Sequence, residues 1–356
     1  MRVLYSEAAI RRKYGVAWSE KLCKAAAKLG PAEDVSGKSA DEIRSVIAGL
    51  PANQSCVLVG GYDLIPTFDR PNPTLNMSGD DDESIPTDAP YGVAPGAPRA
   101  QEFAPTRPVA RIPDATGNAD PADFIKVLRF QEVATTTKTP AKRFERCAAE
   151  FTLATGAVSR AMGRRGKIVT SPPAKLDGAP DVIKELSGSG RVHVLLHGAN
   201  RSPDWAYLFG HGEDDDSPYP KAMSARQIDL CDLRGAAVTF SSCYAAMLDS
   251  GMSEAGQRNE NNQVALACLG HGAKFVVAVT RSNWIGMDGD GDSLGPGLIA
   301  DVWRQLVRGR TAGEAVQAGR IAYLRRDLAR SGREDRKYVL KSALQLQLYG
   351  NPEAKL

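Results

Sequence analysis

Two residue types that can act together in catalysis each follow an apolar run in the second half of the chain. His197 follows the run VHVLL, and Cys243 follows AAVTFSS, 46 positions later (197 to 243). A cysteine attacks as the thiolate, and a free thiol with a pKa near about 8.5 is mostly protonated at neutral pH, so it needs a neighbouring histidine or positive charge. If the two runs are adjacent strands, the pattern predicts a Cys-His pair.

Gly198 comes directly after this histidine. Because glycine has no Cβ atom, the backbone at this position can approach a substrate closely. The backbone N–H groups of Gly198 and Cys243 could therefore form an oxyanion hole, which stabilises the negative charge of a tetrahedral intermediate. A structural interpretation stays open beside this one, because free cysteines are among the most buried residues and a histidine at a strand end can simply satisfy backbone groups.

The elements that must position these residues alternate between strands and helices. Buried apolar runs predict the strands, and amphipathic runs with capping boxes at Ser39/Glu42 and Thr311/Glu314 predict helices. This alternation predicts an α/β fold with a mostly parallel sheet flanked by helices, in which ligands bind beyond the carboxyl ends of the strands. We expect strands over 55–61, 107–113, 147–156, 192–198, 236–243, 273–280 and 343–350, and helices over 17–30, 39–51, 120–133, 180–190, 261–270, 296–308 and 312–331.

The chain is expected to divide at a polar linker. It has 356 residues, more than the roughly 250 to 300 at which single cores stop growing. Pro, Asp and Gly dominate residues 62–121, which predicts long loops that are functional or disordered, and the later run TTTKTPAKR is typical of a linker. We predict a smaller N-terminal α/β subdomain with long loops over 1–138, and a second subdomain with His197 and Cys243 over 139–356.

Composition excludes several classes of function. A net charge of +3 gives no indication of a nucleic-acid or membrane partner. No apolar run approaches the roughly 20 residues that span a bilayer, and Glu7, Arg11 and Arg12 lie where a signal peptide needs its apolar stretch, so we expect a cytoplasmic protein. The six cysteines form no CxxC pair, so their spacing indicates neither a zinc site nor a disulfide framework, and we expect no required cofactor.

A serine hydrolase is one alternative. Residues 291–295 (GDSLG) match the G-x-S-x-G nucleophile elbow, with Ser293 as the nucleophile. The elbow must follow a buried strand, but the residues before it read WIGMDGDGD, and all four histidines precede the serine. These facts make the serine hydrolase a distant third interpretation.

The same stretch has the acidic spacing of a calcium loop. An EF-hand that started at Asp288 would need glycine at its sixth position and glutamate at its twelfth, where this chain has Ser293 and Ile299. We interpret the stretch as an acidic loop, with calcium as the one structural ion that it could hold.

Taken in order, the motifs resemble those of the gingipain-like cysteine peptidases (family C25), which share the caspase-type fold of clan CD. The resemblance runs from about residue 55 to the end. Three departures are Ala110 for the usual glycine, Leu196 for the first glycine of the family's G-H-G, and Asn351 for an aspartate. The matching segments are SCVLVGGYDLIPTF, IPTDAPYG, RPVARIPDATGNADPADFIKVLRFQE, ELSGSGRVHVLLHGANRSPDW with Trp205, AAVTFSSCYAA, AKFVVAVTRSNW, RGRTAGEAVQAGRIAYL and LQLYGNPEAKL.

The resemblance implies a cysteine endopeptidase that acts on a protein or peptide substrate. Cys243 would be the nucleophile, His197 the general base, and the amides of Gly198 and Cys243 the oxyanion donors. In caspases the histidine precedes the cysteine by about 50 residues, close to the spacing here. The family's S1 pocket maps onto Leu195, Ser241 and Trp284.

His211, in FGHG, is the rival for the catalytic histidine, and His197 is preferred because the apolar run ends there. His193 is expected to point into the sheet interior, and His271 to cap a helix. Arginine-specific members carry an acid in the loop that reads GAVSRAMGRRGK here. Its absence argues against trypsin-like cleavage and leaves a bare Cys-His dyad, and the basic residues in that loop, Arg160, Arg164 and Arg165, favour an acidic or C-terminal carboxylate substrate.

Two further interpretations concern turnover. The chain could be a catalytically silent caspase-like scaffold or interaction module, although it keeps the cysteine, the histidine and the pocket tryptophan. It could also be a latent enzyme, covered by the loops over 62–121 or 211–224 until it is processed or bound. The sequence does not predict an oligomeric state.

Overall fold

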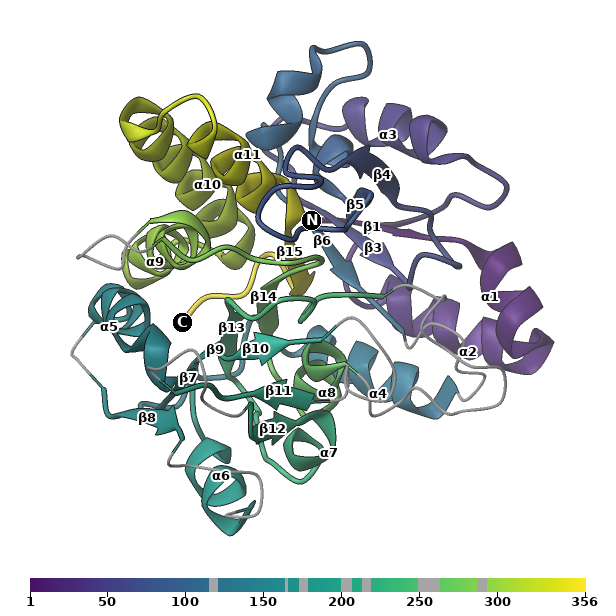
Figure 1. The fold of residues 1–356 in the computed structure, drawn as a ribbon. Helices are drawn as coiled ribbons and strands as arrows, with labels where there is room; N and C mark the ends of the chain where they lie inside the picture. The colour runs from purple at the N-terminus through teal and green to yellow at the C-terminus, as the bar shows by residue number, and fades with distance from the viewer. Residues whose placement is uncertain are drawn as a thin grey trace.

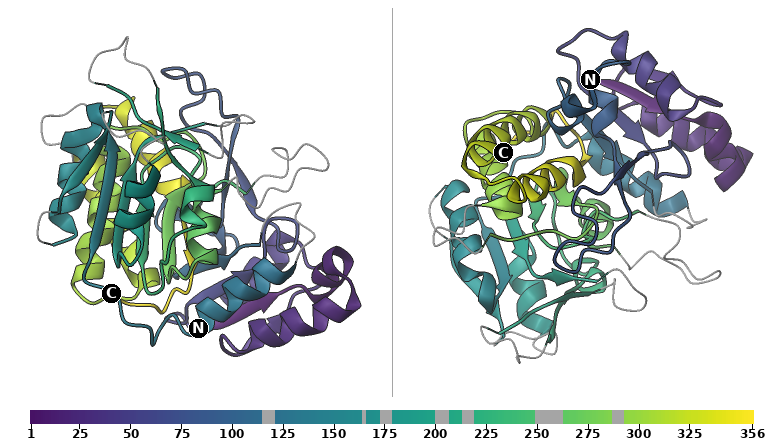
Figure 2. Two further views of the ribbon diagram at one scale, coloured as in Figure 1. Left: turned by 90° about the horizontal axis from the view of Figure 1, so that it is seen from below. Right: turned by 45° about the horizontal axis from the view of Figure 1, so that its top comes forward.

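A computed structural model describes residues 1–114, 121–163, 166–172, 179–199, 207–212, 219–248, 263–286 and 293–356. One large sheet crosses the molecule, and helices lie on both of its faces (Figure 1, Figure 2). Its strands follow the order β2-β1-β3-β6-β15-β14-β13-β9-β7-β8. The predicted α/β fold with a mostly parallel sheet is confirmed.

The strands of this sheet form two parallel blocks that run in opposite directions. Pairs within each block are parallel, whereas β14 and β15 are antiparallel where the blocks meet. The carboxyl ends of the two blocks therefore lie at opposite edges of the sheet. One block comprises β1 (Arg2–Tyr5), β2 (Ala32–Asp34), β3 (Cys56–Val59), β6 (Val109–Ile112) and β15 (Leu346–Gly350); the other comprises β7 (Arg143–Ala148), β8 (Ile168–Ser171), β9 (Arg191–Leu195), β13 (Ala237–Phe240) and β14 (Phe275–Val279).

The helices form two layers whose members contact one another in series. Figure 1 shows the layer of α5, α9, α10 and α11 apart from the layer of α4, α7 and α8. The first layer comprises α5 (Thr152–Ala161), α9 (Leu294–Val307), α10 (Ala312–Arg330) and α11 (Asp335–Gln345), with α3 (Ala40–Ala48) farther along the sheet. The second comprises α1 (Glu7–Tyr14), α2 (Val16–Ala27), α4 (Pro121–Glu132), α8 (Val264–Gly270), α7 (Ala225–Ile228) and α6 (Ala179–Leu186).

Local sequence explains where several helices begin. Both predicted capping boxes are confirmed, since Ser39 accepts from the Glu42 amide at the start of α3 and Thr311 accepts from the Glu314 amide at the start of α10. Each box satisfies two backbone groups that have no partner inside the helix. The helix α11 was not predicted, and its last three residues were predicted as the start of the strand over 343–350, because they open the apolar run ALQLQLYG; the strand itself begins only at Leu346.

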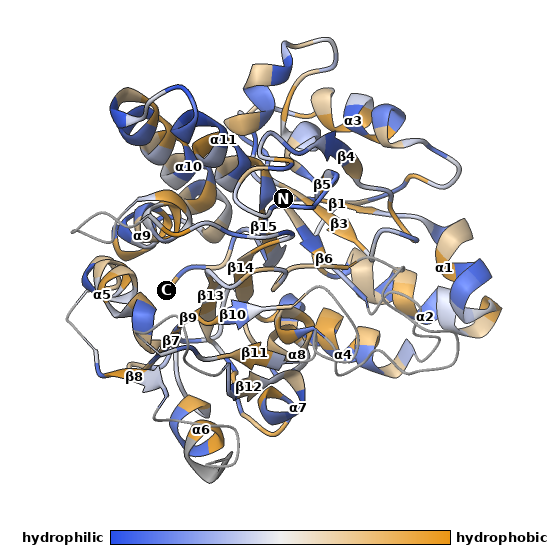
Figure 3. Ribbon diagram, viewed as in Figure 1, coloured by the Kyte–Doolittle hydropathy of each residue, from blue (hydrophilic) through white to orange (hydrophobic). Residues whose placement is uncertain are grey.

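The core lies between the sheet and the two helix layers. Figure 3 shows the hydrophobic residues gathered on the central strands β9, β13 and β14. The helix α9 is buried along most of its length, and its Trp303 is completely buried while the indole N–H donates to Thr239 Oγ1 over 2.9 Å. This packing fixes the layer that covers β13, the strand that leads to Cys243.

The predicted strand over 147–156 is wrong except for its first two residues. The strand β7 ends at Ala148, a 3-10 turn follows over Ala149–Phe151 (η3), and α5 begins at Thr152. Small and apolar side chains in 154–159 are buried on the helix, where α5 packs against α9. A close helix-helix contact favours such small residues. Because they form a continuous run without charges, the stretch was predicted as a strand.

The loop-rich stretch 62–121 is ordered over its described part. It contains the antiparallel pair β4 (Phe68–Pro71) and β5 (Ser84–Thr87), two 3-10 turns, η1 (Ala89–Gly92) and η2 (Arg99–Phe103), and the strand β6. The completely buried Arg111 donates from Nε and Nη2 to the carboxylate of Asp88, each over 2.7 Å. Two parallel hydrogen bonds of this kind are among the strongest side-chain contacts.

The predicted subdomain boundary at residue 138 lies between α4 and β7. The large sheet joins strands from both sides of it, and β15 pairs with β6. The two-subdomain division stays a prediction. No helix in the described part of the chain is long and apolar enough to cross a membrane.

Candidate active site

Three side chains that could act together in catalysis follow three adjacent strands. Glu150 comes two residues after β7, His197 two residues after β9, and Cys243 three residues after β13. These strands are parallel neighbours, with β9 in the middle. Because the carboxyl ends of parallel strands meet at one edge of a sheet, the three side chains gather there.

The histidine strand is fastened to the cysteine strand by backbone packing. A Cβ atom added at Gly198 would lie 1.9 Å from the Cys243 carbonyl oxygen, which no side chain could accept without a shift of the backbone. One residue before His197, the Leu196 amide donates to Ser242 Oγ over 3.0 Å. The predicted neighbourhood of the Gly198 and Cys243 backbones is therefore present.

Cys243 lies in a pocket of backbone groups. Its Sγ accepts a hydrogen bond from the Asn283 amide over 3.2 Å, and it lies 3.7 Å from the Asn283 carbonyl oxygen. Burial raises the pKa of the thiol, and the amides of Asn283 and Gly198 and the charge of Lys341 only partly oppose this effect. Among the described contacts the thiol makes no hydrogen bond with His197.

His197 is held by a carboxylate that sequence reasoning missed. Its Nε2 lies 2.5 Å from Glu150 Oε1, and the Phe151 ring lies 4.7 Å from the imidazole ring, centroid to centroid. Burial lowers the pKa of His197, and the hydrogen bond and charge of Glu150 oppose this effect. The expectation that His197 lacks an acidic partner is therefore wrong. The signal was the acid just past the strand in CAAEF, which was hidden because 147–156 was read as one strand.

The rival histidine shares the same carboxylate. His211 Nδ1 lies 3.0 Å from Glu150 Oε1, and its ring centroid lies 5.6 Å from that of His197. The imidazole of His211 is 4% exposed and stacks on the Tyr219 ring at 4.1 Å and 8°. Sequence reasoning treated the two histidines as competitors, whereas the structure brings both to Glu150.

A small antiparallel sheet carries both histidines. It comprises β10 (His197–Gly198), β11 (Tyr207–Phe209) and β12 (Lys221–Ser224), and His211 follows β11. The Ala149 amide donates to the His211 carbonyl over 2.9 Å, and the His211 amide donates to Ser171 over 3.0 Å. The small sheet is thus tied to the ends of β7 and β8.

The remaining histidines have structural positions. His193 is completely buried, and its Nδ1 lies 3.0 Å from Thr239 Oγ1, while burial lowers its pKa to about 3. His271 is the C-cap residue of α8. Both predictions are confirmed.

The three predicted pocket residues lie on three different segments of the chain. Leu195 is buried with Cys147 and Ala154, and Ile285, next to Trp284, packs against that cluster. Ser241 is buried, and its carbonyl accepts from Asn283 Nδ2 over 2.7 Å. Trp284 packs edge-on against Tyr338 of α11 at 5.2 Å. Their role in substrate binding stays a prediction.

The acidic loop that precedes β5 contacts the residues next to Cys243 and Asn283. The Tyr244 hydroxyl donates to Asp82 over 3.1 Å, and the Ser282 amide donates to the same carboxylate over 3.0 Å. Lys341 of α11 is completely buried. Its ammonium group donates a hydrogen bond to the Asp80 carboxylate and lies 3.6 Å from that of Asp82. This network holds Tyr244, the neighbour of Cys243, and Ser282, the neighbour of Asn283.

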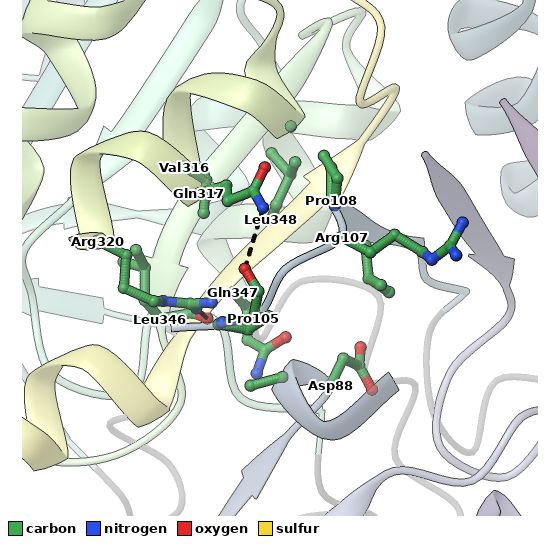
Figure 4. Close-up of a pocket in the computed structure, with 13 residues that line it drawn as sticks. Asp88, Pro105, Arg107, Pro108, Val316, Gln317, Arg320, Leu346, Gln347 and Leu348 are labelled. Atoms are coloured by element: carbon green, nitrogen blue, oxygen red, sulfur yellow. Dashed lines mark hydrogen bonds between the residues drawn. The ribbon is translucent and has the colours of Figure 1, made fainter. Parts of the chain in front are cut away.

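Two hollows lie away from these side chains. A cavity of about 30 Å³ has room for about one water molecule. Figure 4 shows Gln317 Nε2 donating to the Pro105 carbonyl across it.

An open groove of about 510 Å³ between α5 and α9 is lined by Arg160, Arg304 and Arg308. It lies near the amino end of β9, where Gly163 meets Arg191, so Arg160 gives no support for an acidic substrate.

Several predicted features lie outside the described residues. They are Trp205, Arg164, Arg165, the acidic run 213–216 and the calcium-like run 288–292. Ser293 of the GDSLG motif is the N-cap residue of α9.

Comparison with known proteins places this geometry in a recognised fold. No family model and no curated protein sequence matches the chain. Among solved structures, the complex of Porphyromonas gingivalis RgpB pro- and mature domains matches with a TM-score of 0.64 and 11% identity, over 100% of this chain and 79% of that chain. The Arg-specific cysteine proteinase gingipain R (RGPB) matches with a TM-score of 0.63 and 12% identity, over 100% and 78%. The chain has a gingipain-like fold, which is a caspase-like peptidase fold.

Proposed function

We propose that the protein is a cysteine peptidase with Cys243 as the nucleophile and His197 as the general base. The observation that carries this proposal is the close packing of Gly198 on the Cys243 backbone, which brings the histidine strand end to the cysteine. Glu150 completes a triad by holding the imidazole. Nucleophile, base and orienting group are the three parts that acyl transfer through a cysteine requires.

The geometry supports a definite order of proton movements. His197 Nε2 faces Glu150, so the other ring nitrogen, Nδ1, is the one that takes the thiol proton. The thiolate then attacks the substrate carbonyl carbon, and the Gly198 and Cys243 amides stabilise the oxyanion. His197 returns the proton to the leaving amine, and a water molecule activated by His197 hydrolyses the thioester. Glu150 stabilises the imidazolium in both halves of the reaction.

The environment of the thiol supports a latent enzyme. Burial raises the pKa of Cys243, and Asn283 occupies the thiol's hydrogen bonds. A productive substrate or an activating partner protein would have to bring the thiol to His197. Apo peptidases often tighten such contacts only when substrate binds. The same observation favours the second candidate, a catalytically silent scaffold.

Leu195, Ser241 and Trp284 are proposed to form the S1 pocket. All three are uncharged, so we expect no preference for Arg or Lys at P1. The substrate is a protein or peptide, and no metal is required for the chemistry of the triad.

A peptide-library cleavage profile tests the proposal. Wild type is compared with Cys243→Ala and His197→Ala, with Cys23→Ala as the matched control, because Cys23 is another partly exposed thiol. Cleavage by wild type and the control, lost in both site variants, supports the proposal. If wild type cleaves nothing and iodoacetamide labels Cys243 no faster than Cys23, the chain is the scaffold.

A further inference from the structure

Glu150, His197 and His211 bring three metal-binding atoms together. One ligand atom from each residue lies within 4.8 Å of the other two. Glu150 Oε1 is the shared centre, at 2.5 Å from His197 Nε2 and 3.0 Å from His211 Nδ1. The peptidase chemistry uses the Glu150–His197 pair, but it gives no role to His211.

The imidazole of His211 lacks a conventional partner. It is 4% exposed, and neither ring nitrogen makes a hydrogen bond with another described residue. Its Nδ1 is close to Glu150 Oε1 but does not have the geometry of a hydrogen bond. A buried polar group without a hydrogen bond is costly, and a metal ion is a partner that its lone pair could take.

We propose that Glu150, His197 and His211 bind a divalent transition metal ion of the zinc class. Two imidazoles and one carboxylate are a common set of three protein ligands for zinc, with water in the fourth position. Nitrogen ligands of this kind disfavour calcium and magnesium, which prefer oxygen. His197 would bind through Nε2 and His211 through Nδ1, the atoms that already face the carboxylate.

The elements that hold the three ligands are fixed by backbone contacts. Glu150 lies on the turn between β7 and α5, and the amide of the preceding residue, Ala149, donates to the His211 carbonyl. The Tyr219 ring stacks on His211, and the Phe151 ring lies against His197. Such support orients ligands and strengthens a metal site.

This site would regulate the peptidase, a consequence that rests on the proposed function. The metal takes Glu150 Oε1 and His197 Nε2, which are the two atoms that orient the base. A neutral imidazole that binds a metal through Nε2 carries its proton on Nδ1, so Nδ1 of His197 has no lone pair left to accept the thiol proton. Metal binding would therefore inhibit cleavage reversibly.

Binding is tested on the Cys243→Ala variant, so that neither the thiol nor turnover contributes. The chelator-treated protein is titrated with Zn²⁺ by calorimetry and with Co²⁺ by visible absorption. We expect one ion per chain and the intense absorption of tetrahedral Co²⁺. His211→Ala and His211→Gln, made in the same background, should each weaken binding by at least about 10- to 100-fold, the loss that follows removal of even a hydrogen-bond partner of a ligand. His271→Ala is the control, because His271 is a partly exposed histidine 3.4 Å from Asp229.

The outcomes separate the metal site from the peptidase. No binding by Cys243→Ala, or equal binding by both His211 variants when circular dichroism shows them folded, overturns the site. Zinc inhibition of wild-type cleavage that chelator reverses, with each His211 variant less inhibited relative to its own metal-free rate, supports the regulatory role. If wild type has no activity but the Cys243→Ala titration succeeds, the proposed function fails while the metal site stands.

Discussion

Gly198 and Cys243 pack so closely that a Cβ atom at position 198 would lie 1.9 Å from the Cys243 carbonyl oxygen. The strand end that carries His197 and the strand end that carries Cys243 thus pack directly against each other. Any side chain at 198 would have to separate them.

Gly198→Ala should destabilise the protein and abolish cleavage. The added methyl group forces the two backbones apart, and overpacking of this kind costs about 1–3 kcal/mol. Urea unfolding and the cleavage assay measure the two effects. Gly270→Ala is the control, because nothing lies within 4 Å of its Cβ position on α8. A fully active Gly198→Ala variant would show that the contact does not position the site.

Glu150→Gln should lower kcat/KM by about 10- to 100-fold, because the neutral amide cannot stabilise the imidazolium as a carboxylate does. The side chain keeps its size, so the free energy of unfolding should change little. Glu20→Gln serves as the control, since Glu20 is exposed and pairs only with Lys24 among the described residues. Unchanged kinetics in Glu150→Gln would show that Glu150 does not take part in catalysis and that the site is a Cys-His dyad.

Alkylation of Cys243 should depend steeply on pH. Burial raises the pKa of this thiol. Since the thiolate is the reactive form, the rate should rise about tenfold per pH unit through neutral pH and level off above the pH of about 8.5 at which a free thiol titrates. Iodoacetamide labelling followed by mass spectrometry, with Cys243→Ala as the blank, gives the profile. If the alkylation rate reached half of its maximum below about pH 8, Cys243 would not be a protonated thiol in the resting protein.

Lys341→Met should destabilise the protein by about 3–5 kcal/mol, because it leaves the buried Asp80 without its counter-charge. Adding Asp80→Asn to this variant should restore part of the loss. Urea unfolding of the two single variants and the double variant measures the coupling, and Lys24→Met, in an exposed pair, should change stability by less than about 1 kcal/mol. Additive effects of the two buried substitutions would show that the pair is not coupled.

Sequence reasoning located Cys243 and His197 because each follows a short buried strand, and buried strands have a strong apolar signal. It missed Glu150 because small residues on the α5–α9 contact look like a strand. It also treated His211 as a competitor, since the small sheet that folds it back onto Glu150 depends on tertiary packing. The network of Asp80, Asp82 and Lys341 joins residues about 260 positions apart, which no local pattern reveals.

The place of β15 in the sheet has a consequence for synthesis on the ribosome. It follows every other strand in the chain, yet it lies in the middle of the sheet, between β6 and β14. Until it emerges, those two strands have open edges, which are sites for aggregation and for chaperone binding. Joining the two halves is therefore the last step in building the sheet, and early exposure of the unfinished halves is where this protein would be most vulnerable in the cell.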